Sequence, residues 1–467
     1  GGSGYVYTSS TASSYPSGCL LNSNYYLASA STTEGINIGH GKATITYIGK
    51  ELDFIDKSGA NAPVLASNMI PVYYDETNEV WKKANTSNLD KNNPWYSYNS
   101  SGEYKGMWAN AVTVKDTNRQ TYLNAIPGTI IPMDDINTMW VWIPRFNAVT
   151  PSNYNGGTQT SPGAIDVTFV KQNETAIDAF TFGNKELSGF WYAKFEVSHS
   201  TLASSTTANN LGCTTETCSN ANGIIIKPNV RSLQYNDISN FFFASRSMEQ
   251  AGNSFGFVSS EVDTHMSKNN EWGAGAYLTQ SIYGRCTNST TCTEVGINNN
   301  SSYLTGYGAP AGSGDSVTNG TYNTTLGKDA STTGTIYGIY DMSGGAWEYV
   351  MGVLADTNGN PRSGYGSSYS WNSGFTGMLG NGTTYTGIAF PDSKYYNLYT
   401  GTSYTGHALT ETKNWYSDIA NFVDAWDPWF VRGGRYSKGA DAGVFYFGND
   451  FGNAKVDRSS RFVITNE

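Results

Sequence analysis

Large hydrophobic and polar side chains alternate over short stretches in much of the chain. Residues 190–198 (FWYAKFEVS) show this alternation, whereas 140–146 (WVWIPRF) is a nearly continuous hydrophobic run that ends at a proline. Both patterns predict strands. Apolar residues instead recur three to four positions apart in 236–250 and again in 265–278, which predicts two amphipathic helices. Few strands, two helices and long loops together predict an α+β domain with much irregular structure.

The same pattern divides the chain into three parts. Residues 1–50 include a strand bounded by glycines, 41–49 (GKATITYIG), and this part resembles the end of the glycine-rich β modules of bacterial surface proteins. Residues 51–135 combine a polar connector with a small β region of short aromatic strands, separated by loops rich in Asn, Asp, Ser and Gly. The main domain is then expected to span 136–467.

Composition narrows the functional classes. Only 14% of the 467 residues are charged and another 14% are aromatic, a mixture typical of a folded chain with a neutral polar surface and of extracellular proteins. The net charge of −10, without any Lys/Arg cluster, argues against nucleic acid as a partner. Apolar runs are far shorter than the ~20 residues of a membrane span. Because the sequence begins with Gly, we interpret it as processed or as a fragment.

The five cysteines favour an oxidising compartment. Cys213 and Cys218 are close in sequence, as are Cys286 and Cys292, so each pair is expected to form a local disulfide. The alternative is one zinc site made by these four thiolates. Cys19 is left over and is expected to pair with a missing upstream segment.

One motif points to a known family. Residues 337–350 (YGIYDMSGGAWEYV) resemble the signature of the formylglycine-generating enzyme superfamily, also called sulfatase-modifying factors, whose fold is a variant of the C-type lectin fold. Other stretches resemble landmarks of that superfamily and occur in the same order: 190–197, 269–278, 431–434, 439–445 and 460–464. The resemblance implies a C-type-lectin-like domain over 136–467.

The signature also suggests a structural metal. Asp341 and Glu348 place two carboxylates on either side of a glycine-rich turn, and such hard oxygen ligands suit calcium. The resemblance implies calcium held by these two side chains and by the backbone oxygens of Gly344 and Ala346. The alternative is a capped turn, in which both carboxylates accept hydrogen bonds from backbone amides around a buried Trp347. Neither interpretation is catalytic.

The chain lacks the residues that carry the superfamily's chemistry. The oxidases bind copper through two cysteines in the C-terminal part of the domain, and this chain has no cysteine after Cys292. The iron-dependent branch needs a histidine cluster, whereas the four histidines here are scattered along the sequence at positions 40, 199, 265 and 407. We therefore expect no enzymatic activity.

The C-terminal segment 432–462 interleaves two kinds of residue. Small and apolar residues form a frame, and between them lie large side chains of mixed chemistry, which is typical of a binding surface on a rigid scaffold. The segment resembles the variable region of proteins diversified by retroelements. The alternative is an ordinary polar loop face. The candidate ligand-binding residues are Arg435, Tyr436, Lys438, Tyr446, Asp450, Phe451, Lys455, Asp457 and Arg458.

These observations lead to a functional hypothesis. We expect an adhesin or receptor, secreted or on the bacterial cell surface, that binds a protein or glycan ligand without catalysis. One alternative is an oxidase of the formylglycine-generating class. Another is a structural pilus or stalk subunit that uses its C-terminal face as an assembly contact.

Overall fold

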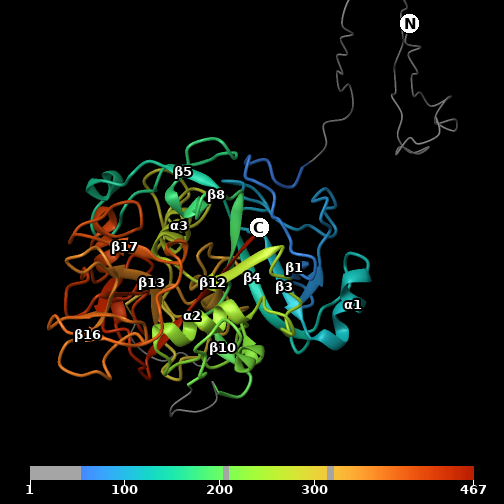
Figure 1. Cartoon of the computed structure of the whole chain (residues 1–467). Helices are drawn as coiled ribbons and strands as arrows, with labels where there is room; N and C mark the ends of the chain where they lie inside the picture. The colour runs from blue at the N-terminus through green and yellow to red at the C-terminus, as the bar shows by residue number, and fades with distance from the viewer. Residues whose placement is uncertain (1–53, 203–209, 313–319, 467) are drawn as a thin grey trace, which may run out of the picture. The chain divides into compact units, whose positions relative to one another are not determined.

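Two β-sheets organise the part of the chain that the computed structural model describes, which is residues 54–202, 210–312 and 320–466 (Figure 1). The larger sheet has seven strands in the order β12-β21-β9-β4-β3-β1-β2, and all neighbours are antiparallel. Residues 1–50 and Cys19 lie outside the described residues. The seven strands are β1 (Ile70–Asp75), β2 (Val80–Lys83), β3 (Asn110–Val114), β4 (Ile136–Pro144), β9 (Gly189–Ala193), β12 (Val262–Met266) and β21 (Phe462–Asn466).

The second sheet is centred on β13 (Trp347–Leu354), in the orange part of Figure 1. This strand pairs in parallel with β17 (Asn397–Tyr399) and β20 (Arg458–Ser460), and antiparallel with β18 (Trp429–Arg432). Antiparallel to β18 lies β19 (Phe447–Asp450). The smaller sheets contain β14 (Arg362–Gly364), β15 (Gly377–Leu379) and β16 (Thr384–Tyr385); β5 (Phe146–Ala148) and β6 (Val167–Phe169); β7 (Thr181–Phe182) and β8 (Lys185–Glu186); and β10 (Ser198–His199) and β11 (Ile224–Ile225).

Helices are few and short, so the described part is a mixed α+β structure dominated by strands and loops. The α-helices are α1 (Asp116–Asn124), α2 (Ile238–Ser247), α3 (Asn269–Thr279) and α4 (Thr325–Asp329). The 3₁₀ turns are η1 (Asn153–Gly156), η2 (Asp178–Phe180), η4 (Ser219–Gly223), η5 (Ser393–Tyr395), η6 (Thr410–Thr412), η7 (Trp415–Ser417) and η8 (Gly439–Asp441).

Helix α2 confirms the helix predicted within 236–250, and it begins where Asp237 accepts a hydrogen bond from the backbone N–H of Asn240 at 2.9 Å. The helix predicted over 265–278 is confirmed as α3, but its predicted first residue is wrong. Its first residues belong to β12, which pairs along its length with β21, and α3 begins only at Asn269. The predicted amphipathic character is also wrong, because every residue of α2 and α3 is buried.

The alternating pattern of 190–198 has an unexpected basis, because its polar side chains are buried too. Lys194 is 0% exposed and donates from Nζ to the carbonyl oxygens of Ile336 and Gly338 at 2.7 and 2.8 Å. Glu196 is 1% exposed and accepts from the backbone N–H of Ala346 at 2.8 Å. The polar half of this segment therefore holds the signature loop instead of facing water, as buried polar groups require.

The domain boundary expected near residue 136 does not separate two bodies. Strands β3 and β4 lie on either side of it in sequence, and they are paired neighbours in one sheet, with Asn110 opposite Val141. The small β region of 51–135 thus extends the sheet of the main domain. Strands β1, β3 and β4 are largely buried. The stretch 439–445, one of those that resemble a superfamily landmark, forms η8 and a loop that leads into β19.

Arg461 joins the two sheets. It lies between β20 of the smaller sheet and β21 of the larger one, and it is completely buried. Its guanidinium donates to both carboxylate oxygens of Glu348 at 3.0 and 2.5 Å, and to the carbonyl oxygens of Ala193 and Tyr340 at 2.9 Å each. A buried cation is tolerated only with such complete pairing.

Replacing Arg461 by Met should therefore leave Glu348 buried without its cation. We expect the free energy of unfolding to fall by about 3–5 kcal/mol, measured by chemical denaturation. The double variant Arg461→Met, Glu348→Met should recover part of that loss because no unpaired charge remains. Lys413→Met, at an exposed position, is the control and should change stability by less than about 0.5 kcal/mol. An equal effect of R461M and K413M would contradict the assignment.

His265 forms a second buried charge network. Its Nδ1 lies 3.1 Å from Asp263 Oδ1 and its Nε2 lies 2.9 Å from Glu271 Oε1, and the ring stacks on Phe182. Burial by itself lowers the pKa of His265, but the two carboxylates outweigh burial and raise the pKa above its usual value. The imidazolium form is therefore the one that this environment stabilises.

The sign of the resulting pH dependence follows from that raised pKa. The contribution of His265 to stability is fully present below the unfolded pKa of about 6.5 and is lost as pH rises through the higher folded pKa. We expect the stability difference between the wild type and His265→Gln to shrink on going from about pH 5.5 to pH 9, measured by urea denaturation. A difference that grows with pH would refute this assignment.

Candidate functional site

The strongest candidate site is built around the ring of Trp347, the first residue of β13. Strand pairing fixes its neighbour, because Trp347 lies opposite Arg458 in the parallel register of β13 and β20. Two more residues, Arg435 and Lys438, come from the loop after β18. That loop turns at Gly434, which has a φ of +72° and where an added Cβ would lie 2.6 Å from Ala442 Cβ, so a glycine is needed there.

Three cationic side chains surround this ring. The distances from the ring centroid are 4.0 Å to Arg458 Cζ, 4.6 Å to Arg435 Cζ and 5.6 Å to Lys438 Nζ. Each lies within the range of a cation–π interaction. The carboxylate of Asp457 joins two of these cations, at 2.8 Å from Arg435 and 2.7 Å from Arg458. We call Trp347, Arg435, Lys438, Asp457 and Arg458 the Trp347 cluster.

Beneath the cluster, Asp450 provides a buried anchor. It accepts from Arg458 at 2.6 Å, from Lys455 at 2.9 Å and from the hydroxyl of Tyr349 at 2.8 Å. Burial alone raises the pKa of Asp450, but Arg458 and Lys455 outweigh it and hold the pKa below its usual range. Four cations against two carboxylates give this region a positive excess on a chain whose net charge is −10.

The nine residues predicted to bind ligand divide into two groups. Tyr446, Asp450 and Arg458 are only 5%, 2% and 8% exposed, so the expectation that they stand exposed is wrong. Asp450 lies on β19, which pairs with β18, and Arg458 lies on β20, which pairs with β13, while Tyr446 directly precedes β19. Local sequence does not reveal these pairings. The other six are half-buried, and whether they bind a ligand stays a prediction. They are Arg435, Tyr436, Lys438, Phe451, Lys455 and Asp457.

Sequence reasoning missed two aromatic residues beside these six. Trp347 was expected to be buried within the signature, but it is half-buried and carries the cationic cluster. Tyr303 packs edge-on against Tyr436, with ring centroids 5.0 Å apart. The position of Trp347 just after Gly344, Gly345 and Ala346 was the one available signal that the ring begins a strand at the edge of a turn.

The two carboxylates predicted to bind calcium accept hydrogen bonds from protein groups in this structure. Both oxygens of Glu348 are bound to the guanidinium of Arg461, and Oδ1 of Asp341 accepts from Asn298 at 2.9 Å and from the backbone N–H of Gly306 at 3.0 Å. Burial raises the pKa of Asp341 to about 6 and that of Glu348 to about 7, although Arg461 opposes both shifts. The donors that reach these oxygens are N–H groups, and calcium binding with Gly344 and Ala346 stays a prediction.

The capped-turn alternative describes one of the two carboxylates of the loop. Asp341 does cap a backbone amide, whereas Glu348 binds an arginine instead. Gly345 of this loop has a φ of +68°, and a Cβ there would lie 2.4 Å from an oxygen of Glu196. Glycine is therefore required by the close approach of that buried carboxylate.

Both disulfides are confirmed, Cys213–Cys218 and Cys286–Cys292, so the alternative of one zinc site made by four thiolates is wrong. The described histidines lie apart and have local partners: His199 bonds Asn220, and His407 lies 2.7 Å from Asp178. Across residues 54–202, 210–312 and 320–466, no three His, Cys, Asp or Glu side chains gather as a metal site would need. Within the same ranges, no helix combines the length and hydrophobicity required to cross a membrane.

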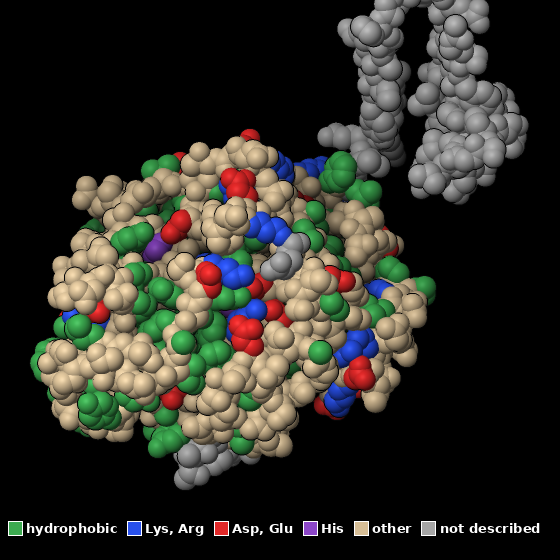
Figure 2. Space-filling view, viewed as in Figure 1, with side chains coloured by type: hydrophobic (Ala, Val, Ile, Leu, Met, Phe, Trp, Pro, Cys, Tyr) green, Lys and Arg blue, Asp and Glu red, His purple; other side chains and the backbone are tan. Residues whose placement is uncertain are grey.

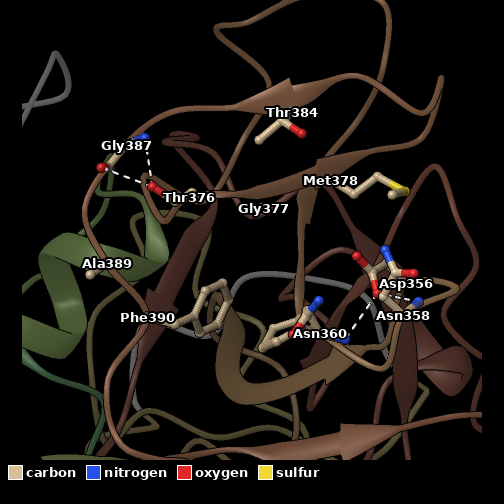
Figure 3. A pocket seen from close by; sticks show the side chains of 11 residues that line it. Asp356, Asn358, Asn360, Thr376, Gly377, Met378, Thr384, Gly387, Ala389 and Phe390 are labelled. Carbon is tan, nitrogen blue, oxygen red and sulfur yellow. Dashed lines mark hydrogen bonds between the residues drawn. The ribbon is translucent and has the colours of Figure 1, made fainter.

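A cavity of about 600 Å³ lies elsewhere, beside the three-stranded sheet of β14, β15 and β16 (Figure 3). Amide and hydroxyl side chains line it together with Phe390 and Met378. Its single charged side chain is Asp356, and Oδ1 of that residue accepts from the backbone N–H groups of Asn358 and Asn360 at 2.8 and 2.9 Å. The cavity is thus close to neutral and offers no acid–base pair.

Comparisons with known proteins give weak structural similarities. No family model and no characterised protein sequence matches the chain. Treponema denticola variable protein 1 is 14% identical, with a TM-score of 0.31, over 71% of this chain and 97% of that one. PvdO from Pseudomonas aeruginosa is 12% identical, with a TM-score of 0.29, over 71% and 95%. The Major Tropism Determinant U1 variant is 14% identical, with a TM-score of 0.25, over 77% and 72%. At these scores the similarities assign neither family nor function.

Proposed function

We propose that this chain is an extracellular, non-catalytic ligand-binding protein, an adhesin or receptor on a C-type-lectin-like scaffold, and that the Trp347 cluster is its binding face. The observation that carries the proposal is that the half-buried Trp347 ring is surrounded by three cations and is carried by a strand whose interior is buried. Binding residues commonly lie on loops positioned by a rigid scaffold, and Trp and Arg are the residues most enriched at binding hot spots.

The chemistry of the cluster favours an acidic ligand. The side chain of Arg435 is 34% exposed, and its planar guanidinium suits bidentate contact with a carboxylate or sulfate group. The positive excess would attract such groups to a protein that is acidic elsewhere. The ligand class is therefore a protein or glycan that bears carboxylates or sulfates.

Two further properties support an extracellular location. Disulfides persist in oxidising compartments, and both described pairs are formed. The polar surface depends on hydroxyls and amides more than on charge, since only 14% of residues are charged.

We also propose that the loop after β18 is diversified by a retroelement. An adenine-mutated near-copy of the last forty or so codons beside a reverse transcriptase gene would test this.

The binding test uses the full chain against arrays of acidic and neutral proteins and glycans. We expect Arg435→Ala with Lys438→Ala to weaken binding of an acidic ligand by about tenfold or more, which is about 1.4 kcal/mol. Raising the salt concentration from about 0.05 to 0.5 M should weaken it as well. Both residues are half-buried and outside the strands, so the variant should keep the wild-type unfolding free energy within about 1 kcal/mol.

The control is Lys413→Ala, which removes an exposed charge outside the cluster and should leave affinity unchanged. If every ligand detected binds the double variant and the wild type equally, the Trp347 cluster is not the binding face. If the same variant instead breaks a filament of the protein, the face serves assembly.

A further inference from the structure

A second surface feature, separate from the cation cluster, consists of four aromatic side chains. The ring centroid of Tyr365 lies 4.7 Å from that of Phe451, 5.1 Å from that of Trp371 and 5.3 Å from that of Trp426. Trp371 also stacks on Phe451 at 5.6 Å with an interplanar angle of 11°. We call these four residues the aromatic platform.

The platform is assembled from three distant segments and is held by the frame. Tyr365 follows β14, Phe451 follows β19 and Trp426 precedes β18. The loop that carries Trp371 is closed by a hydrogen bond from the backbone N–H of Tyr365 to the carbonyl oxygen of Trp371 at 2.9 Å. Trp429 of β18 donates from its indole to the carbonyl oxygen of Ser363 at 2.9 Å, which ties β14 to the second sheet. The rings are therefore positioned before any ligand arrives.

The exposure of the two tryptophans distinguishes this platform. All twelve tryptophans of the chain lie in described residues, and only Trp371 and Trp426 are exposed, at 40% and 45%. Figure 2 shows hydrophobic side chains reaching the surface at the left of the molecule, where Figure 1 places β16. Leaving two large rings partly in water forgoes the stabilisation that burial gives nine of the other tryptophans, and clustered exposed aromatics mark interaction sites.

Charge around the platform is uneven, because Trp426 is flanked in sequence by Asp424 and Asp427, whereas the segment that carries Tyr365 and Trp371 is almost neutral. Residues 357–391 contain a single charged side chain, Arg362, which is only 9% exposed. Lys455 lies 4.4 Å from the ring centroid of Phe451, but its charge is paired with Asp450 at 2.9 Å. Hydroxyl and amide side chains lie near these residues. Ser367, Ser368 and Ser370 lie between Tyr365 and Trp371 in sequence. The amide of Asn381 donates to the carbonyl oxygen of Gly366 at 2.5 Å and its oxygen accepts from the hydroxyl of Thr383 at 2.7 Å.

We infer that the aromatic platform binds an uncharged glycan chain. A pyranose ring has a flat face of C–H groups that stacks on an aromatic ring, and a rim of hydroxyls that both donate and accept hydrogen bonds. The platform supplies the matching elements, which are two partly exposed indole rings together with hydroxyl, amide and carboxylate side chains that can form hydrogen bonds with sugar hydroxyls. An acidic glycan or protein would find no free cation among residues 357–391. This inference stands independently of the Trp347 cluster, whose proposed ligand is acidic.

The test measures binding of the full chain to a panel of uncharged oligosaccharides of hexoses and N-acetylhexosamines. We expect one or more to quench tryptophan fluorescence, with Trp371→Ala and Trp426→Ala each weakening binding by about tenfold. Trp371→Phe should retain part of the affinity because a ring remains. Binding should change little between about 0.05 and 0.5 M salt, since no ion pair is involved.

Two controls separate this site from other surfaces. Tyr404→Ala, which removes an exposed ring outside the platform, should bind the oligosaccharide as the wild type does. Arg435→Ala with Lys438→Ala should also leave oligosaccharide binding intact, so the two proposals can fail separately. Binding by none of the panel, or equal binding by the wild type and Trp371→Ala, would overturn the inference. So would a dimer that dissociates in Trp426→Ala, because the platform would then meet a second copy of the chain.

Discussion

The ion pair between Arg461 and Glu348 is the contact on which the two-sheet architecture depends. Arg461 sits between strands of the two sheets, and its guanidinium reaches the start of β13, the end of β9 and the signature loop at once. In a low-dielectric interior these hydrogen bonds are strong, and each acceptor left unpaired would be costly. The signature residues thus act as a structural joint here, since the same carboxylate that was expected to hold calcium holds this arginine instead.

Local signals explain how much of the fold could be predicted from the sequence. Helix α2 was predictable because its apolar spacing and its cap at Asp237 are encoded in neighbouring residues. Helix α3 was predicted four residues too early, because β12 owes its strand conformation to pairing with β21, almost two hundred residues later. Lys194 occupies a polar position in an alternating segment, yet its ammonium group is buried and donates to the carbonyl oxygens of Ile336 and Gly338 at the start of the signature. Contacts between segments distant in sequence decided the last two cases, and the composition of the segments does not indicate those contacts.

The candidate site was predictable to the extent that its residues lie on one loop. Arg435 and Lys438 follow a pair of glycines and do remain partly exposed, as expected. Asp450 and Arg458 looked equivalent to them in sequence, but the arrangement of β13 and β20 places them underneath the surface. Trp371 was missed because it lies in a polar, glycine-rich stretch, and Trp426 because it lies among the other apolar residues of the segment that leads into β18. Only the folded chain brings their rings together around Tyr365.

The position of Trp347 next to Glu348 on β13 has a consequence for recognition. Successive side chains of a strand point in opposite directions, so one peptide unit separates the interior joint from the outward-facing indole. The indole is therefore attached to a backbone that the buried ion pair holds in a fixed position. A partner that docks against it would not have to freeze a mobile side chain, and the entropic penalty of association would fall mainly on the flexible lysine and arginine arms around it.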